Sequence, residues 1–150
     1  MTPKEYMKEI LLPTLSEYEE DTQSRRRAYL ACIVVYHLSD YLKKAGADNP
    51  AKKMCNQCTT AWNVVHAVAI GAKHRDNAEN KNPLKFTAGS DAYRPPARAG
   101  LLECGWSILG DHEGSIVIDA SEDNLMADVL QALRGVLRQY HVLYGETYLQ

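Results

Sequence analysis

Long apolar runs are absent from this sequence of 150 residues. No stretch approaches the roughly 18 consecutive apolar residues that suggest a membrane-spanning helix, so we expect none. The first residues, MTPKEYMKEILLPTL, also lack the basic and then apolar layout of a secretory signal. We therefore expect a cytoplasmic protein that has no membrane partner.

An excess of charge of either sign is also lacking. The chain has 17 Lys and Arg against 19 Asp and Glu, which gives a formal net charge of −2. This balance provides no global field that attracts nucleic acid, and the basic residues form no obvious DNA-binding patch. The basic run Arg25–Arg27 follows an acidic segment, and we expect it to pair with the carboxylates there: Glu17, Glu19, Glu20 and Asp21.

Cysteine is scarce, and the motifs of common enzyme classes are missing. Among the four cysteines, Cys55 and Cys58 form one C-x-x-C, whereas a structural zinc site usually has a second such pair. A thioredoxin-like redox motif would follow a strand and open a helix, whereas this C-x-x-C lies inside a helical pattern. We therefore expect reduced core cysteines in preference to a metal or redox site, and no bound cofactor. The chain also has no phosphate-cradling glycine loop, no His-Glu-x-x-His motif and no nucleophile elbow, so its motifs favour no enzyme class.

Helical periodicity dominates what the sequence does contain. The length and an apolar fraction of 45% predict one domain, 1–150, with a hydrophobic core. Apolar residues recur at helical spacing in four segments: Pro3–Leu12, Thr14–Asp21, Ser24–Lys44 and Pro50–His74. We expect a last helix to begin at the cap residue Ser121 and to bury one face, formed by Met126, Leu130, Leu133, Leu137, Tyr140 and Tyr144.

The region before this last helix has a different pattern. Residues 76–99 are polar and rich in Asn, Gly and Pro, which predicts a long loop. Leu101–Leu109 and Ser115–Asp119 are typical of short strands, and the turn GDHEG between them predicts a β-hairpin over about 101–119. The expected fold class is therefore mainly α, a four-helix-type bundle with a small β-hairpin inserted before the last helix.

Two apolar helical segments carry aligned polar residues. Arg26, His37 and Asp40 share one side of the first segment, and the second aligns Cys55, Trp62, His66 and Lys73. A helix that is apolar all round is normally buried, and buried ionisable groups must be paired. These residues therefore form either a polar network in the core or the lining of a pocket. A metal site formed by His37, Asp40 and His66 is one hypothesis, and a hydrogen-bonded His–Asp pair balanced by Arg26 or Lys73 is the alternative.

The second of these helical segments ends in a basic cluster formed by Lys73, His74 and Arg75. These cations complement the carbonyl end of a helix. We favour this capping role, and binding of the phosphate or carboxylate of a ligand is the alternative. Both interpretations remain open at the level of sequence.

Arg134 and His141 lie seven residues apart on the last helix and flank its apolar stripe. In this arrangement the chain resembles the HEPN superfamily of small helical bundles, although Gly135 stands where that family usually has a polar residue. The resemblance implies a metal-independent ribonuclease that acts across a homodimer groove. In such an enzyme, Arg134 stabilises charge on an RNA phosphate and His141 transfers a proton.

Tyr140, Tyr144 and Tyr148 form a stripe on the same helix, which indicates either the edge of the core or a face for self-association. The leading hypothesis is a helical-bundle protein that acts through interaction, as a homodimer, and not as an enzyme. The alternatives are a HEPN-type ribonuclease that cleaves RNA and a bundle that binds a metal or a small ligand.

Overall fold

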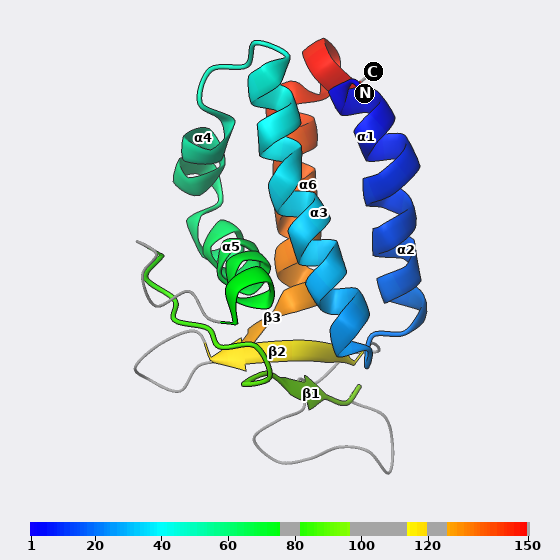
Figure 1. Ribbon diagram of the computed structural model, residues 1–150, viewed down its shortest axis with the longest axis vertical. Helices are drawn as coiled ribbons and strands as arrows, with labels where there is room; N and C mark the ends of the chain where they lie inside the picture. The colour runs from blue at the N-terminus through cyan, green and yellow to red at the C-terminus, as the bar shows by residue number, and fades with distance from the viewer. Residues whose placement is uncertain (76–81, 97–113, 120–125, 150) are drawn as a thin grey trace.

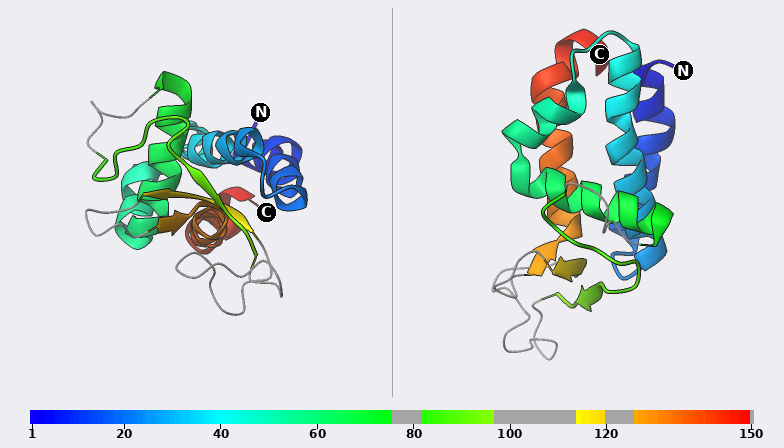
Figure 2. Two further views of the ribbon diagram at one scale, coloured as in Figure 1. Left: turned by 90° about the horizontal axis from the view of Figure 1, so that it is seen from below. Right: turned by 60° about the vertical axis from the view of Figure 1, so that its left-hand side comes forward.

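The computed structural model describes residues 1–75, 82–96, 114–119 and 126–149 of the chain (Figure 1). It is mainly helical with one small antiparallel sheet, so the expected fold class is confirmed at this level. Figures 1 and 2 show the three strands across one end of the helices. The start of the first helix contacts the last helical turn of the chain at the opposite end.

The N-terminal helical segment is continuous through Pro13. It consists of α1 (Pro3–Tyr6), a π-helical turn (Met7–Leu11) and α2 (Leu12–Glu20). Thr2 caps α1, because its hydroxyl accepts from the Glu5 backbone N–H while the Glu5 carboxylate accepts from the Thr2 N–H. Proline has no N–H and crowds the carbonyl four residues earlier, so a wider turn just before it lets the helix continue.

The central helix α3 (Arg25–Lys44) forms where the periodicity predicts it. Ser24 is its N-cap and accepts a hydrogen bond from the Arg27 backbone N–H at 3.4 Å. The helix ends at Lys44 with Ala45 as its C-cap, and Gly46 follows with φ 99°, a left-handed conformation that glycine adopts without strain. The predicted start and end of this helix are both confirmed.

The expected single helix over Pro50–His74 is wrong, because the chain forms two helices, α4 (Pro50–Gln57) and α5 (Thr59–His74). The break is at Cys58, which has φ −140° and ψ 53°. There, the Thr59 hydroxyl donates to the Cys55 carbonyl at 2.6 Å, and the Cys58 thiol contacts the Met54 carbonyl at 3.2 Å. These side chains occupy carbonyls at the end of α4 and so favour the break.

The sheet consists of β1 (Ala92–Arg94), β2 (Ser115–Asp119) and β3 (Met126–Asp128), with β2 in the middle. The predicted strand 115–119 is confirmed. Its described neighbours are β1 and β3, and the expected hairpin strand 101–109 lies outside the described residues. The expectation that 76–99 is a loop throughout is wrong at β1, because backbone pairing with a distant strand leaves no local sequence signal.

The last helix, α6 (Val129–Tyr144), begins later than expected. Its N-cap is Asp128, whose carboxylate accepts from the Gln131 N–H at 3.0 Å. The expected start at Ser121, which lies outside the described residues, is wrong because Met126 belongs to β3 and not to the helix. Pairing with β2 therefore keeps these residues extended until Asp128.

The inward sides of the helices and of β2 form one hydrophobic core. Its largest fully buried side chains include Tyr18, Leu38, Met54, Ile118, Leu133 and Tyr140. None of the helices in the described ranges is long and apolar enough to span a membrane.

Candidate functional site

A cluster of three polar side chains lies on the outer side of α3. It consists of His37 and Asp40 of α3 and Lys73 of α5. The Nδ1 atom of His37 lies 2.8 Å from the Asp40 Oδ2 atom, and its Nε2 atom lies 3.4 Å from the Lys73 Nζ atom. An ammonium group can only donate, so His37 accepts from Lys73 and donates from Nδ1 to Asp40. The expected His–Asp pair is confirmed, and Lys73 of α5 joins it as the expected balancing cation.

His66 does not join this cluster. Its ring stacks on Tyr36, with centroids 4.9 Å apart and an interplanar angle of 6°. Burial lowers the pKa of His66, which favours the neutral ring. Within the described ranges, no group of three or more His, Cys, Asp or Glu side chains is placed to hold a metal ion. The ligand set that a metal site at His37, Asp40 and His66 requires is therefore not assembled there.

The basic end of α5 is exposed. Lys73, His74 and Arg75 all face solvent, and Lys73 also reaches across to His37 on α3. Arg75 has φ 70°, and its carbonyl accepts from the Ala88 N–H at 2.6 Å, so the chain around Ala88 lies against the end of the helix. The cluster thus closes α5 and at the same time presents positive charge beside α3.

The pairing expected between Arg25–Arg27 and the acidic end of α2 is wrong for Arg25, which bonds Asp91 instead. Arg27 does reach α2, but it donates to the Glu17 backbone carbonyl. Glu19, one of the expected acidic partners, pairs with Arg134. Arg26 lies exposed on the outer side of α3. Tertiary contacts, which sequence proximity does not reveal, decide these pairings.

Arg134 connects α6 to α2. Its Nε and Nη2 atoms lie 3.0 and 2.9 Å from the Glu19 Oε1 atom. His141 is exposed two turns further along the helix. The guanidinium that the ribonuclease hypothesis assigns to an RNA phosphate is therefore already engaged by a carboxylate.

Two of the three tyrosines of the stripe, Tyr140 and Tyr144, face the interior. Tyr140 is fully buried and Tyr144 nearly so, and both continue an aromatic row with Trp62 and Tyr148. The core-edge interpretation is confirmed for Tyr140 and Tyr144, whereas Tyr148 is only partly buried. Self-association through this stripe stays a prediction.

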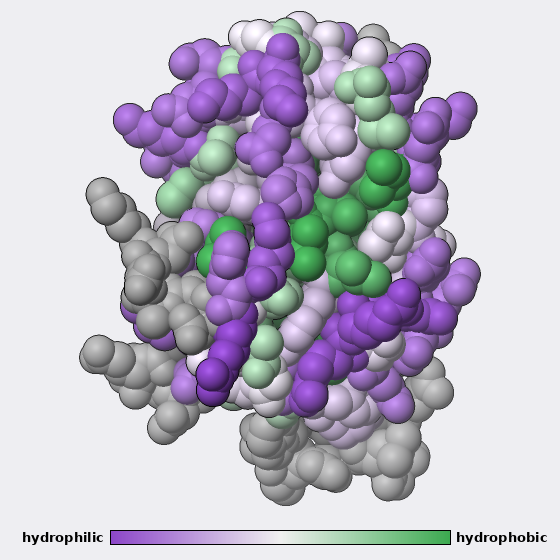
Figure 3. Space-filling view, viewed as in Figure 1, coloured by the Kyte–Doolittle hydropathy of each residue, from purple (hydrophilic) through white to green (hydrophobic). Residues whose placement is uncertain are grey.

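One surface was not anticipated from the sequence. Leu30 of α3 is 36% exposed, and Ile33, Val34 and Ile10 are partly buried beside it. Figure 3 shows a hydrophobic patch over α3 and the adjoining N-terminal helices, bordered by hydrophilic residues. We call Ile10, Leu30, Ile33 and Val34 the apolar strip. The sequence has apolar residues on every side of α3. Such a pattern predicts a helix that is buried all round, so it does not reveal an exposed apolar surface.

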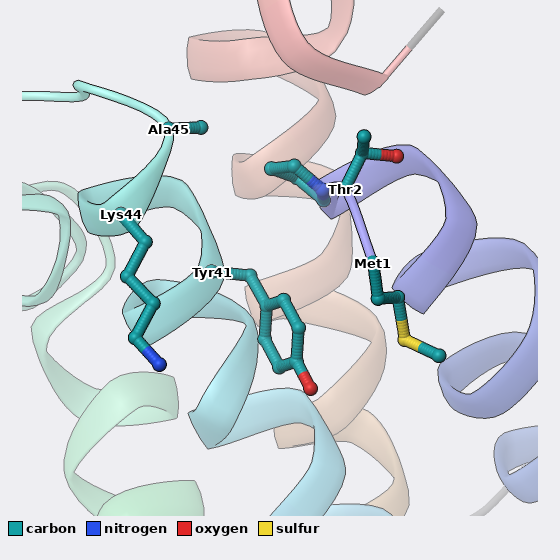
Figure 4. Close-up of a pocket in the computed structure, with 6 residues that line it drawn as sticks. Met1, Thr2, Tyr41, Lys44 and Ala45 are labelled. Atoms are coloured by element: carbon teal, nitrogen blue, oxygen red, sulfur yellow. The ribbon is translucent and has the colours of Figure 1, made fainter.

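A pocket of about 440 Å³ lies at the C-terminal end of α3 (Figure 4). It is lined by Met1, Thr2, Pro3, Tyr41, Lys44 and Ala45. The Tyr41 ring is held by stacking on Tyr6, with centroids 4.0 Å apart and an angle of 18°. The pocket therefore has one rigid aromatic wall and a flexible lysine at its edge.

Comparison of this chain with protein-family models, with curated proteins and with solved structures found no match. A functional argument must therefore rest on the residues and geometry of the chain itself.

Proposed function

We propose that this protein acts through interaction, as a homodimer whose interface is the outer face of α3. The observation that carries the proposal is the apolar strip together with the charges at its two ends. Exposed apolar patches with a polar border are typical of protein interfaces. Here three of the four residues of the apolar strip lie on α3, which α2 and α5 flank. The fourth, Ile10, belongs to the adjoining N-terminal helical segment, so a partner meets a continuous helical surface.

The charges on α3 favour a second copy of this chain as the partner. Arg26 and Asp40 are both exposed, carry opposite charges, and lie seven residues before and seven residues after Ile33. In a dimer with antiparallel α3 helices and Ile33 on the two-fold axis, Arg26 faces the partner's Asp40. The symmetry repeats this contact on the other side, so one sequence feature gives two ion pairs.

The His37–Asp40–Lys73 cluster is compatible with this arrangement. Asp40 uses Oδ2 toward His37, and a carboxylate accepts several hydrogen bonds through its two oxygens. His37 and Lys73 thereby hold the Asp40 side chain in position for the partner's Arg26. We assign the cluster a positioning role at the border of the interface.

Analytical ultracentrifugation over a wide concentration range tests the proposal. We expect a dimer for the wild-type protein, a monomer for Ile33→Asp, and an unchanged far-UV circular dichroism spectrum for both. Leu12→Asp is the matched control, because Leu12 is 44% exposed on α2 and lies outside the apolar strip. A wild-type monomer at high concentration contradicts the proposal.

Charge-reversal variants test the proposed contact between Arg26 and Asp40 directly. Arg26→Asp and Asp40→Arg should each weaken the dimer, because each places like charges opposite one another. The double variant restores opposite charges and should restore association. A dimer that is insensitive to all these changes has its interface elsewhere.

The ribonuclease hypothesis for Arg134 and His141 stays a prediction with a separate test. It requires Arg134 to exchange Glu19 for an RNA phosphate. Cleavage of RNA by the wild-type protein, lost in Arg134→Ala and His141→Ala without loss of helicity, is its expected signature. Inactivity of the wild-type protein toward varied RNAs counts against it.

A further inference from the structure

A pair of thiols lies at the junction between α4 and α5. Cys55 belongs to the last turn of α4, and Cys58 is the residue between the two helices. Both are free and partly exposed, whereas Cys32 of α3 is free and completely buried. The end of α4 therefore carries two partly exposed thiols three residues apart, where the backbone departs from the helix.

The spacing of the pair is compatible with a disulfide. Asn56 and Gln57 are helical, and residues three apart in an α-helix have Cα atoms about 5 Å apart. Disulfides need Cα separations of roughly 4.4–6.8 Å. Burial raises the pKa of Cys58, the Trp62 backbone N–H opposes this rise, and Cys55 adds to it.

We propose that Cys55 and Cys58 are a redox-active dithiol that a small-molecule disulfide converts to an intramolecular disulfide. The Cys55 thiolate attacks one sulfur of the reagent RS–SR, which forms a mixed disulfide and releases the first RS⁻. Cys58 then attacks the Cys55 sulfur, forms the Cys55–Cys58 bond and releases the second RS⁻. The two protein thiols lose two protons and two electrons in total, and the reagent becomes two RSH.

The surroundings of Cys58 assign the order of these steps. Its thiol contacts the carbonyl of the buried Met54 at 3.2 Å, and its raised pKa leaves less thiolate at neutral pH. Cys55 is therefore the first nucleophile, and Cys58 is the resolving thiol. Oxidation removes the contact with Met54 and fixes the junction between the two helices. This inference is independent of the proposed dimer.

Intact-mass analysis of the full chain after incubation with oxidised glutathione tests the inference. We expect peptide mapping to locate a bond between Cys55 and Cys58, with the loss of two hydrogens and no glutathione on either residue. Cys58→Ser should instead hold one glutathione on Cys55. In Cys55→Ser, the reaction at Cys58 should be much slower, and Cys32 should stay unmodified in the folded protein as the buried control.

Three outcomes overturn the inference. One is a wild-type protein in which both thiols remain free, and another is a protein that carries a separate glutathione on each. The third is a disulfide that joins either residue to Cys104. Serine is nearly isosteric with cysteine, and circular dichroism confirms that each variant is folded before it is oxidised.

Discussion

Arg25 and Asp91 form an ion pair with one buried and one exposed partner. The Arg25 Nε atom donates to Asp91 Oδ2 at 2.7 Å, and the two side chains are 54% and 1% exposed. The Tyr29 hydroxyl donates to the other carboxylate oxygen of Asp91 and accepts from the Gly89 N–H at 2.8 Å. These bonds attach the segment before β1 to α3, so one buried carboxylate positions the edge of the sheet.

Loss of this carboxylate should destabilise the fold. Hydrogen bonds to charged groups contribute about 1.5–3 kcal/mol each, so we expect Asp91→Ala to lower the free energy of unfolding by about 3 kcal/mol. Urea unfolding followed by circular dichroism measures the change. Asp48→Ala is the control, because Asp48 is 89% exposed in its 3.6 Å pair with Lys53 and should cost under about 1 kcal/mol. Equal effects at the two positions contradict this account.

The parts of the fold that depend on local chemistry were predictable. Ser24 and Gly46 give clear start and end signals, and the periodicity of α3 lies between them. The start of α6 was not predictable, because Ser121 and Asp128 are both good caps. The choice between them depends on pairing of β3 with β2, which is a contact between separate segments.

In the candidate site, too, contacts that depend on local spacing were predictable, and contacts between separate segments were not. The pairing of His37 with Asp40 follows from helical spacing, and Lys73 was a reasonable balancing cation. The exposure of Leu30 and the incomplete burial of Ile33 were not predictable, because apolar residues surround α3 and the sequence does not show which side its neighbours leave uncovered. The break at Cys58 depends on individual side-chain hydrogen bonds, which do not change the apolar periodicity.

Because of His66, the free energy of unfolding should decrease at acid pH. Burial lowers its pKa in the folded protein below the ordinary 6.5, so the unfolded chain binds a proton first as the pH falls. Stability from this group is complete above about pH 6.5 and decreases as the pH falls from there toward the folded pKa. His66→Phe keeps a ring to stack on Tyr36 but does not titrate.

Urea unfolding at pH 7 and pH 5 measures this effect. The loss of stability between these two pH values should be smaller in His66→Phe than in the wild-type protein. An identical loss in both proteins means that other groups cause the acid dependence.

Removal of a buried tyrosine hydroxyl is expected to stabilise this protein. The hydroxyls of Tyr140 and Tyr144 are buried, and neither has a hydrogen-bond partner among the described residues. Burial raises the pKa of Tyr140 well above its ordinary value. The nearby Ser39 hydroxyl donates to the Tyr36 carbonyl at 2.9 Å and makes no hydrogen bond with Tyr140. A buried polar group without a partner costs about 1–3 kcal/mol.

We therefore expect Tyr140→Phe to stabilise the protein by about 1 kcal/mol, because it removes this cost and keeps the ring. Chemical denaturation of this variant and of Tyr18→Phe provides the comparison. The Tyr18 hydroxyl accepts from the Ile116 N–H at 3.2 Å, so its removal should destabilise the protein. A loss of stability in Tyr140→Phe shows instead that this hydroxyl is hydrogen-bonded in solution.

Two glycines inside helices should respond in opposite ways to alanine. A Cβ at Gly71 of α5 meets the Phe86 ring at 2.5 Å and the Phe86 carbonyl oxygen at 3.1 Å. The absence of a side chain at Gly71 therefore lets the segment around Phe86 pack directly on α5. At Gly135 of α6, a Cβ meets only the Ala61 Cβ at 3.4 Å, which is an ordinary contact.

Alanine in a helix is favoured over glycine by about 1 kcal/mol. Gly135→Ala should therefore raise the free energy of unfolding by up to about that amount. In Gly71→Ala, overpacking against Phe86 costs about 1–3 kcal/mol and exceeds the helical gain, so the net effect is a loss. Phe86→Leu in the Gly71→Ala background removes ring atoms from the contact and should recover part of the stability. Stabilisation by Gly71→Ala contradicts the close packing of Phe86 on α5.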